Sequence, residues 1–534
     1  MKLPFAGRPR LIVAILTLWL LAPSFMAAWY IWRQGAPIAH ALGTIGLPLL
    51  LLAVSLLLVR SLRRLFFIWL PAAFLVPIQC YLTWFFKSVP GAAFISSVFR
   101  AGPEEFTTTL FAFAWALPLL PLAWFVYVWL VRQLPPELRR TRPWTKAAAA
   151  WTFFYGSFGA LTTAGIAEPT KELGLFAPEV IADSFPTGPL WSVATYLDER
   201  GVTYGGVPVT ASAPADPAVV ILIIGETLRA DHLGINGYAR QTTPELARIQ
   251  DELISYTNVS AGANYTYISM PYIVTQRVGG GRLDISEVFK AAGFFTAWIS
   301  NQEYYVYPAL AELRQFANTN WRLSPHYDTE LLPQIAACLN QCGSRQFITV
   351  HLLGSHFPYD RRYEPKFRRF TPVLGDGPPH FSPSERERFV NSYDNTVLAT
   401  DYVVAQIIEQ ARRTGKPAVV AFTADHGENL YDDERERILH SGKQATRMEA
   451  IVPLVFWAND AWRRTHGAQW QALAARRSLP VAQTSVMPTL TELAGVRYTG
   501  QDETLSLAHP SFTVPHSRLI IQTDGKRVPV DTLR

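Results

Sequence analysis

The sequence contains very little cysteine. Its 534 residues include only Cys80, Cys338 and Cys342, which excludes a disulfide-rich scaffold and a zinc site built from several cysteines. Cys80 lies in a strongly apolar stretch, where a packed thiol is expected. Cys338 and Cys342 are four residues apart, so a local disulfide and two free thiols both remain open.

Charged residues are also scarce, at 17% of the chain against 49% hydrophobic residues. This balance is apolar for a soluble protein. The net charge is +6, yet the last two thirds of the chain contain no lysine- and arginine-dense stretch with interleaved aromatics. The basic residues of the first third lie between apolar runs, so we interpret them as a signal of membrane topology and expect no nucleic-acid partner.

Five apolar runs of membrane-spanning length occupy the first third of the chain. They are Leu11–Trp32, Leu42–Val59, Leu65–Phe86, Phe106–Val131 and Ala147–Ile166. The first run has a basic flank like a signal peptide, but it is long, lacks a clear cleavage site and is followed by further runs, so we expect it to be retained. A buried helical core of a soluble protein is the alternative. The pattern predicts an α-helical transmembrane domain of five spans over residues 1–167.

Basic residues in alternate loops predict the orientation of these spans. Arg60, Arg63 and Arg64 lie in one short loop, and a second basic loop extends from Arg132 to Lys146. Together with the basic N-terminus, these loops belong on the cytoplasmic side. Five spans then place everything after Ile166 outside, so the sequence predicts a multi-pass inner-membrane protein with a periplasmic C-terminal domain.

The remaining chain predicts a proline-rich connector over residues 168–216 and an α/β domain over residues 217–534. The strand candidates are Val219–Ile224, Phe294–Ile299, Phe347–Leu352, Ala418–Thr423 and Val452–Phe456. The helix candidates between and after them are Thr243–Glu252, Ile285–Ala291, Thr329–Leu339, Phe389–Ala411 and Gln483–Leu493. Strands that alternate with helices indicate a mainly parallel sheet covered by helices.

Possible metal ligands follow two of these strands directly. Asp425 and His426 come after one buried strand, and Glu226 comes after another about two hundred residues earlier. Active sites of parallel sheets form beyond the carboxyl ends of the strands. Two carboxylates and one imidazole suit a zinc ion that keeps an open coordination position. Taken alone, the Asp-His pair also fits an ordinary turn with a helix-capping aspartate.

A candidate nucleophile lies in the stretch SAGANYTYISMPY, residues 260–272. Ser260, Thr266 and Ser269 each carry a hydroxyl near an expected helix start, where backbone N–H groups favour an anionic phosphate. A metal ion lowers the pKa of such a hydroxyl and makes it a competent nucleophile. For each of the three, a capping hydroxyl is the alternative.

Further histidines follow the strands. His356 and His440 suit contact with a substrate phosphoryl group or a second metal ion, although a loop histidine is more often a surface residue. We interpret His351 as an ordinary strand residue. Glu428 could contact the ligands of the metal site or be a solvated helix residue, and we favour the solvated helix residue.

Together the motifs resemble those of the bacterial phosphoethanolamine transferases that modify lipopolysaccharide and related glycans, within the sulfatase and alkaline-phosphatase superfamily. The matching stretches are IGETLRADHLGINGYARQTTPEL, SAGANYTYISMP, HLLGSHFPYDRRYEPKFRRFTP, NSYDNTVLATDYVV, TADHGENL and ILHSG. They occur in the family's order and cover the whole predicted soluble domain. The five predicted spans match the family in layout only.

The resemblance implies a role for each candidate residue. Glu226, Asp425 and His426 match the family's metal ligands, and Thr266 matches its nucleophilic threonine, which also contacts the metal. His356 and His440 match positions that bind substrate phosphate or an additional zinc ion. At two places where many relatives carry paired cysteines, this chain has Ala261 and Tyr272. The domain therefore has at most one disulfide, and its rigidity must come from packing.

By resemblance, the expected activity is zinc-dependent transfer of phosphoethanolamine from phosphatidylethanolamine, through a covalent Thr266 intermediate. The expected acceptor is lipid A, a core sugar of lipopolysaccharide or another periplasmic glycan. A phosphoglycerol transferase or a phosphodiesterase would use the same residues. A membrane-anchored sensor or scaffold with an inactive site is a more distant alternative.

Overall fold

The computed structural model describes most of the chain. The residues described are 8–33, 38–87, 89–90, 119–163, 178–199, 207–216, 218–278, 281–302, 307, 309–316, 327–376, 381–523 and 525–534. The chain forms two compact units. The first is built from the N-terminal part up to Gly201 and takes in the short segment Asp433–Arg437, and almost all of the second unit follows Gly201.

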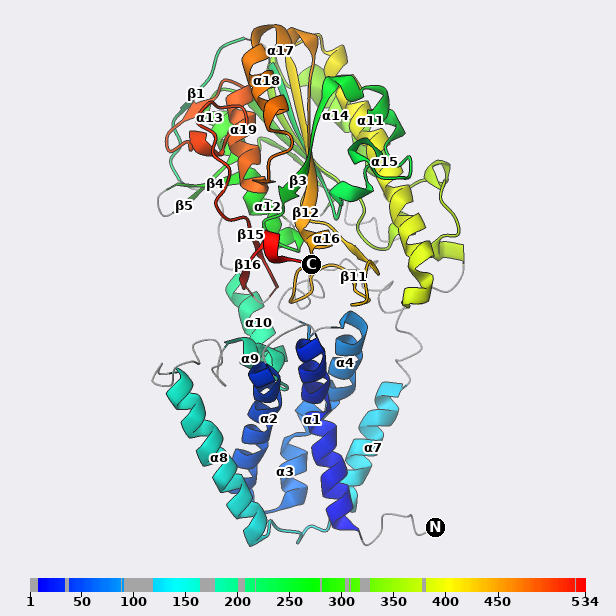
Figure 1. Ribbon diagram of the computed structural model, residues 1–534, viewed down its shortest axis with the longest axis vertical. Helices are drawn as coiled ribbons and strands as arrows, with labels where there is room; N and C mark the ends of the chain where they lie inside the picture. Colours follow the sequence, from blue (N-terminus) through cyan, green and yellow to red (C-terminus); the bar gives the residue numbers. More distant parts are fainter. Residues whose placement is uncertain are drawn as a thin grey trace. The chain divides into compact units, whose positions relative to one another are not determined.

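The first unit is helical (Figure 1). Its helices are α1 (Pro9–Arg33), α2 (Ile38–Leu58), α3 (Leu62–Ile68), α4 (Leu70–Phe86), α7 (Leu119–Gln133), α8 (Arg142–Thr163), α9 (Pro178–Asp183) and α10 (Thr187–Glu199). Helix α1 packs against α2, α4 and α7, and α8 packs against α2. Tyr127 of α7 is fully buried and donates a hydrogen bond to the Phe66 carbonyl at 3.0 Å.

The described helices account for two or three membrane spans, whereas the sequence predicts five. Among the described residues, α1 and α2 are long and apolar enough to cross a membrane, and α3 with α4 adds a third span if this pair, bent by 58°, counts as one. Helix α7 has only 15 described residues, because residues 106–118 of the expected fourth span lie outside the described part. Residues 164–166 of the expected fifth span lie outside it too.

The second unit is an α/β domain with an eight-stranded sheet. The strands, in spatial order, are β13 (Val481–Ala482), β3 (Leu253–Ser260), β12 (Ile451–Ala458), β9 (Ala418–Ala424), β2 (Ala218–Gly225), β8 (Arg345–His351), β6 (Phe295–Ser300) and β7 (Leu313–Gln315). Strand β12 runs antiparallel to both its neighbours, and the other pairings in this sheet are parallel. The sheet is therefore mixed, with the expected parallel core.

All five predicted strands are present, and β2, β8 and β9 form the centre of the sheet. Their Val, Ile and Phe residues are buried on both faces, as expected for a parallel sheet covered by helices. Strands β3, β7 and β13 were not predicted. Strand β3 mixes polar and apolar residues, LISYTNVS, and β7 and β13 have only three and two residues, so none has a long apolar run.

Helices cover both faces of the sheet (Figure 1). They are α11 (Pro244–Arg248), α12 (Thr266–Val274), α13 (Ile285–Ala291), α14 (Leu332–Gln341), α15 (Arg386–Arg413), α18 (Gly467–Arg476) and α19 (Val486–Leu493). Helix α13 has the predicted bounds, whereas α11, α14 and α19 are shorter than predicted or shifted. Cys338 and Cys342, at the end of α14, are free thiols in contact with each other.

The strand register places two candidate metal ligands at one edge of the sheet. Gly225 at the end of β2 is paired with Ala424 at the end of β9, and Ile224 is paired with His351 of β8. The residues that follow Gly225 and Ala424 are Glu226 and Asp425. These two carboxylates therefore leave adjacent parallel strands at the same level.

The buried Asp284 should make stability depend on pH. It caps α13 by accepting a hydrogen bond from the Ser286 N–H at 2.7 Å, and the Tyr307 hydroxyl donates to it at 2.7 Å. Burial raises the pKa of the Asp284 carboxyl to about 6, although both hydrogen bonds oppose the shift. The folded protein thus holds this proton more tightly than the unfolded chain. The resulting stabilisation is complete below about pH 4 and is lost as the pH rises through the folded-state pKa.

We expect Asp284→Asn to remove this contribution. The free energy of unfolding of the wild type, relative to Asp284→Asn, should fall as the pH rises from about 4 to about 7. The fall should be roughly 1.4 kcal/mol for each pH unit between the unfolded-state and folded-state pKa values. Denaturant unfolding of both proteins across this range measures the difference. Parallel curves for the two proteins would contradict the assignment.

Candidate metal centre and active site

The ends of β2 and β9 form the base of the candidate site. Glu226, Asp425 and His426 are almost completely buried. The Nε2 atom of His426 lies 3.5 Å from Glu226 Oε1 and 3.2 Å from Asp425 Oδ2. The other Asp425 oxygen, Oδ1, accepts hydrogen bonds from the backbone N–H groups of Thr227 at 2.9 Å and His426 at 2.7 Å. The three predicted ligands are thus brought together, and the backbone of both strand ends holds the Asp425 carboxylate.

Thr266 is the hydroxyl that reaches this cluster. It is the first residue of α12, and its Oγ1 lies 3.0 Å from Glu226 Oε1 and 3.3 Å from His426 Nε2. Ser260 ends strand β3 inside the sheet. The Ser269 hydroxyl donates to the Asp425 backbone carbonyl and to Gln483. Of the three hydroxyls left open by the sequence, the structure thus brings that of Thr266 to the carboxylates.

Glu226 is held by three side chains. Its Oε1 accepts hydrogen bonds from Thr227 Oγ1 at 2.9 Å and from Thr266, and its Oε2 accepts one from Gln302 Nε2 at 2.8 Å. The loop after β8 also presses on the Glu226 backbone. A Cβ on Gly354 would lie 2.8 Å from Glu226 N, and Gly354 has a positive φ of 48°, so both space and backbone conformation require glycine there.

The histidines of the site are oriented through their Nδ1 atoms. Nδ1 of His426 lies 2.9 Å from the Gly427 carbonyl, and Nδ1 of His356 lies 2.7 Å from the Phe357 carbonyl. A carbonyl only accepts hydrogen bonds, so Nδ1 carries the proton in both rings and Nε2 is the ligating or accepting nitrogen. Nδ1 of His440 lies 3.2 Å from Glu428 Oε1. The centroid of its ring is 4.3 Å from that of His426 and 5.7 Å from that of His356.

Glu428 corrects one interpretation of the sequence. It was expected to be a solvated helix residue, but its side chain is fully buried and follows β9 in an irregular segment. Its Oε2 accepts a hydrogen bond from the Tyr359 hydroxyl at 3.0 Å, and its Oε1 contacts His440. The DHGE motif therefore supplies inward-facing side chains at Asp425, His426 and Glu428.

Burial dominates the electrostatics of the site. It raises the pKa of Glu226 to about 7, with the Asp425 carboxylate adding to the shift. It raises the pKa of Asp425 to about 6 and lowers that of His426 to about 4. Near neutral pH the imidazole is uncharged, so it does not neutralise the two carboxylates beside it. Buried carboxylates in this situation are compensated by a proton or by a bound cation.

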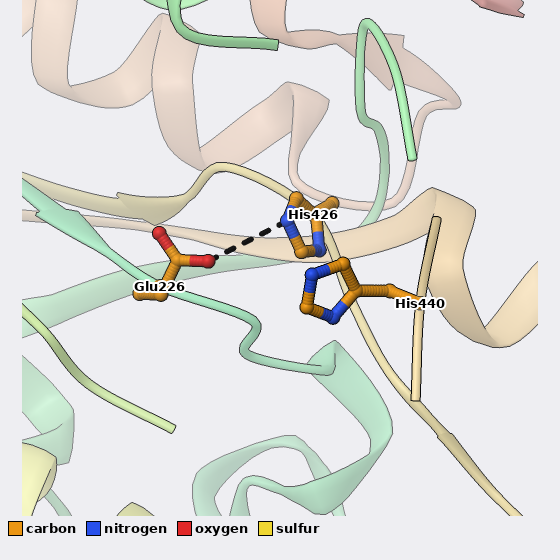
Figure 2. Close-up of side chains that lie close together, drawn as sticks. All are labelled: Glu226, His426 and His440. Atoms are coloured by element: carbon orange, nitrogen blue, oxygen red, sulfur yellow. Dashed lines mark ion pairs between the residues drawn. The ribbon is translucent and has the colours of Figure 1, made fainter. Parts of the chain in front are cut away.

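The donor set fits a zinc ion. Glu226, His426 and His440 each offer a ligand atom within 4.8 Å of the others, and Figure 2 shows the three side chains facing one another. One carboxylate oxygen and two imidazoles are ligands that zinc accepts. The site thus groups His440 with the expected ligands Glu226 and His426. This geometry fits the metal-binding role that the sequence left open for His440 beside contact with substrate phosphate.

Several residues of the site were missed by sequence reasoning. Gln302 follows β6, and its position after a predicted strand is a signal that could have found it. Thr227 contacts Glu226 from the adjacent position in the sequence. Tyr359 lies in the stretch that carries His356, and its nearness to that candidate is a signal that could have found it. Gln483 comes from a distant segment without a motif, and no pattern in the sequence indicates that it reaches this edge.

Replacement of His426 should abolish zinc binding. His426→Ala removes an imidazole that faces both carboxylates, so we expect the purified protein to lose stoichiometric zinc, as measured by elemental analysis after dialysis. His351→Leu is the matched control, because it also removes a buried histidine but from within strand β8. It should retain the zinc of the wild type. Equal zinc content in the two variants would refute the assignment.

The chain is similar to known phosphoethanolamine transferases. It is 27% identical to phosphoethanolamine transferase EptC of Escherichia coli K12 over 316 residues, which cover 56% of this chain and 54% of that protein. The chain spans about half the length of the curated relatives it matches. The zinc complex of the periplasmic domain of EptC from Escherichia coli matches with a TM-score of 0.54 and 26% identity, covering 62% of this chain and 98% of that one.

A second solved structure extends the likeness in fold. The integral membrane lipooligosaccharide phosphoethanolamine transferase EptA from Neisseria meningitidis has a TM-score of 0.71 over 93% of this chain and 98% of that one, at 20% identity. At this identity the match supports the fold: apolar helices followed by an α/β domain. With the curated relatives, it confirms the resemblance that the motifs indicated.

The profile of the sulfatase family matches residues 218–496. This is more than half of the 534 residues, and it includes Glu226, Thr266, His356, Asp425, His426 and His440. The chain therefore belongs to the sulfatase family.

Proposed function

We propose that this protein is a zinc-dependent phosphoethanolamine transferase. The observation that carries the proposal is the position of Thr266, whose hydroxyl meets both Glu226 and His426 at the start of α12. The relatives named phosphoethanolamine transferases and the zinc complex of one of them support the same reaction. We propose phosphatidylethanolamine as the donor, because apolar helices would hold the enzyme at the membrane that contains this lipid.

Glu226, Asp425, His426 and Thr266 would hold one zinc ion. His440, which lies within reach of the same ion, and His356 would contact the substrate phosphate or a second zinc ion. When bound, zinc supplies positive charge that lowers the pKa of the nucleophile and offsets the charge on the phosphoryl oxygens. The chain's own residues position the reactants. Glu226 orients the Thr266 hydroxyl, and the N-terminus of α12 favours an anionic phosphate beside it.

The transfer would occur in two displacements. In the first, Thr266 Oγ1 forms a bond to the donor phosphorus while the phosphorus–oxygen bond to diacylglycerol breaks. The threonine proton ends on the diacylglycerol oxygen, so neutral diacylglycerol leaves. In the second, a hydroxyl or phosphate of the acceptor attacks the phosphorus and Thr266 recovers its proton. The acceptor we propose is lipopolysaccharide, at lipid A or a core sugar, or another periplasmic glycan.

The proposed topology follows from the same chemistry. Residues 1–167 would cross the inner membrane in five spans with a cytoplasmic N-terminus, residues 168–216 would be the connector, and residues 217–534 would form the catalytic domain in the periplasm. This placement puts Thr266 on the side of the membrane where lipopolysaccharide precursors are exposed.

A covalent adduct tests the proposal. Full-length protein in detergent is incubated with zinc and phosphatidylethanolamine, then digested and analysed by mass spectrometry. We expect phosphoethanolamine on the peptide that contains Thr266. Thr266→Val keeps the side-chain shape without the hydroxyl and should form no adduct, whereas Thr266→Ser should retain it at a lower rate.

Control reactions separate the alternatives. A phosphoglycerol adduct formed only with phosphatidylglycerol would identify a phosphoglycerol transferase. Release of free phosphoethanolamine into water at the rate of donor consumption, with or without acceptor, would identify a phosphodiesterase. Zinc binding with no turnover of either lipid by the full-length protein would favour the sensor or scaffold.

A further inference from the structure

Gln483 connects the two halves of the candidate site from a third segment. It follows the short strand β13 and is 1% exposed. Strand β13 pairs in parallel with β3, where Ala482 is the partner of Ser260. Strand β3 leads directly into the loop that carries Thr266. The side chain of Gln483 is therefore placed beneath the nucleophile's loop by the sheet itself.

Both the oxygen and the nitrogen of the Gln483 amide form hydrogen bonds. Oε1 accepts hydrogen bonds from the Gly262 backbone N–H at 2.7 Å and from Ser269 Oγ at 3.1 Å. Nε2 donates to the backbone carbonyls of Ala424 at 2.6 Å and Asp425 at 2.8 Å. Since carbonyls only accept and the Gly262 N–H only donates, these partners fix the orientation of the amide.

These four partners belong to the two segments that must be aligned. Gly262 and Ser269 lie on either side of Thr266 in the sequence. Ala424 ends strand β9, and Asp425 follows it immediately before His426. One buried side chain thus fixes the nucleophile's segment to the segment that carries two proposed zinc ligands, without touching Thr266 Oγ1 or either ligand atom.

Close packing also restrains the same loop. A Cβ on Gly262 would lie 2.3 Å from the ring of Tyr272 in α12, so the loop backbone rests directly on this ring. The Arg282 guanidinium lies 5.5 Å from the centroid of the same ring. Gly262 therefore contacts both the Tyr272 ring and the Gln483 amide.

We propose that Gln483 is a positioning residue that sets the distance between Thr266 Oγ1 and the Asp425–His426 pair. The proposal rests on the proposed function for the identity of the reacting groups. Loss of the amide would remove a partner of the Gly262 N–H and of the Ala424 carbonyl. The Asp425 carbonyl would keep the Ser269 hydroxyl, and the loop would shift relative to the strand end. A shift of about 1 Å in such a site reduces turnover by about 100-fold.

The experiment compares buried glutamines in the full-length protein. Gln483→Leu removes all four hydrogen bonds. Gln483→Glu keeps an acceptor for Gly262 and Ser269 but places a carboxylate oxygen against the two carbonyls of Ala424 and Asp425. With both variants, the test does not depend on the folding of one of them. Gln346→Leu is the matched control, because Gln346 is also fully buried and donates to carbonyls, those of Leu339 at 3.1 Å and Gly343 at 2.7 Å. It lies near the start of β8, at the other end of the strand from the site.

Three quantities are measured for each variant: kcat and KM for phosphatidylethanolamine, zinc affinity by chelator competition, and the thermal midpoint. We expect both Gln483 variants to lose about 100-fold in kcat with little change in KM, and to bind zinc about 10-fold more weakly. Gln346→Leu should lower the thermal midpoint and leave kcat and zinc affinity near those of the wild type.

The outcomes separate positioning from stability. Gln483 and Gln346 variants that lower only the thermal midpoint would show a structural role for both and overturn the proposal. If the wild type turns over no phosphatidylethanolamine, the proposed function fails. The zinc affinities of the variants still decide whether Gln483 is a positioning residue. Weaker zinc binding confined to the Gln483 variants supports positioning, and equal affinities overturn it.

Discussion

The pairing of Gly225 with Ala424 is the constraint on which the site depends. It aligns the ends of β2 and β9 so that Glu226 and Asp425 emerge side by side. Both carboxylates are almost completely buried, and the Asp425 carboxylate raises the pKa of Glu226. A proton or a cation must offset the charge of this pair, because the neighbouring imidazole is uncharged near neutral pH. A bound cation would take this role beside the Thr266 hydroxyl, which contacts Glu226.

Much of this arrangement could be predicted from the sequence. The strands β2 and β9 are apolar, β-branched runs that lead directly into Glu226 and into Asp425-His426, so the runs and the polar residues after them located the edge of the sheet. The choice of Thr266 over Ser260 and Ser269 came from the family pattern, because all three hydroxyls have the same chemistry. The fold then distinguishes the three hydroxyls. Ser260 lies in strand β3 of the sheet, and the Ser269 hydroxyl donates a hydrogen bond to the Asp425 carbonyl.

Other parts could not be read from the sequence because they depend on contacts between distant segments. Glu428 follows a turn whose direction no periodicity specifies, and it was assigned to the surface although Tyr359 and His440 enclose it. Gln483 resembles any polar residue before a helix until β13 pairs with β3. The number of spans could not be predicted for another reason: apolar composition does not distinguish a straight span from the bent pair α3 and α4.

Thr227 shows how tightly the strand ends are defined. Its φ of 59° is unfavourable for a β-branched residue and costs on the order of 1–3 kcal/mol. Such a conformation persists only where several contacts enforce it. Here Asp425 accepts a hydrogen bond from the Thr227 N–H, and Tyr393 of α15 donates one to the Thr227 carbonyl at 2.7 Å. The strained turn directs the Thr227 hydroxyl to Glu226. Asp425 is thus both a proposed ligand and part of the support for the ligand beside it, so its replacement should disturb Glu226 as well as remove its own carboxylate.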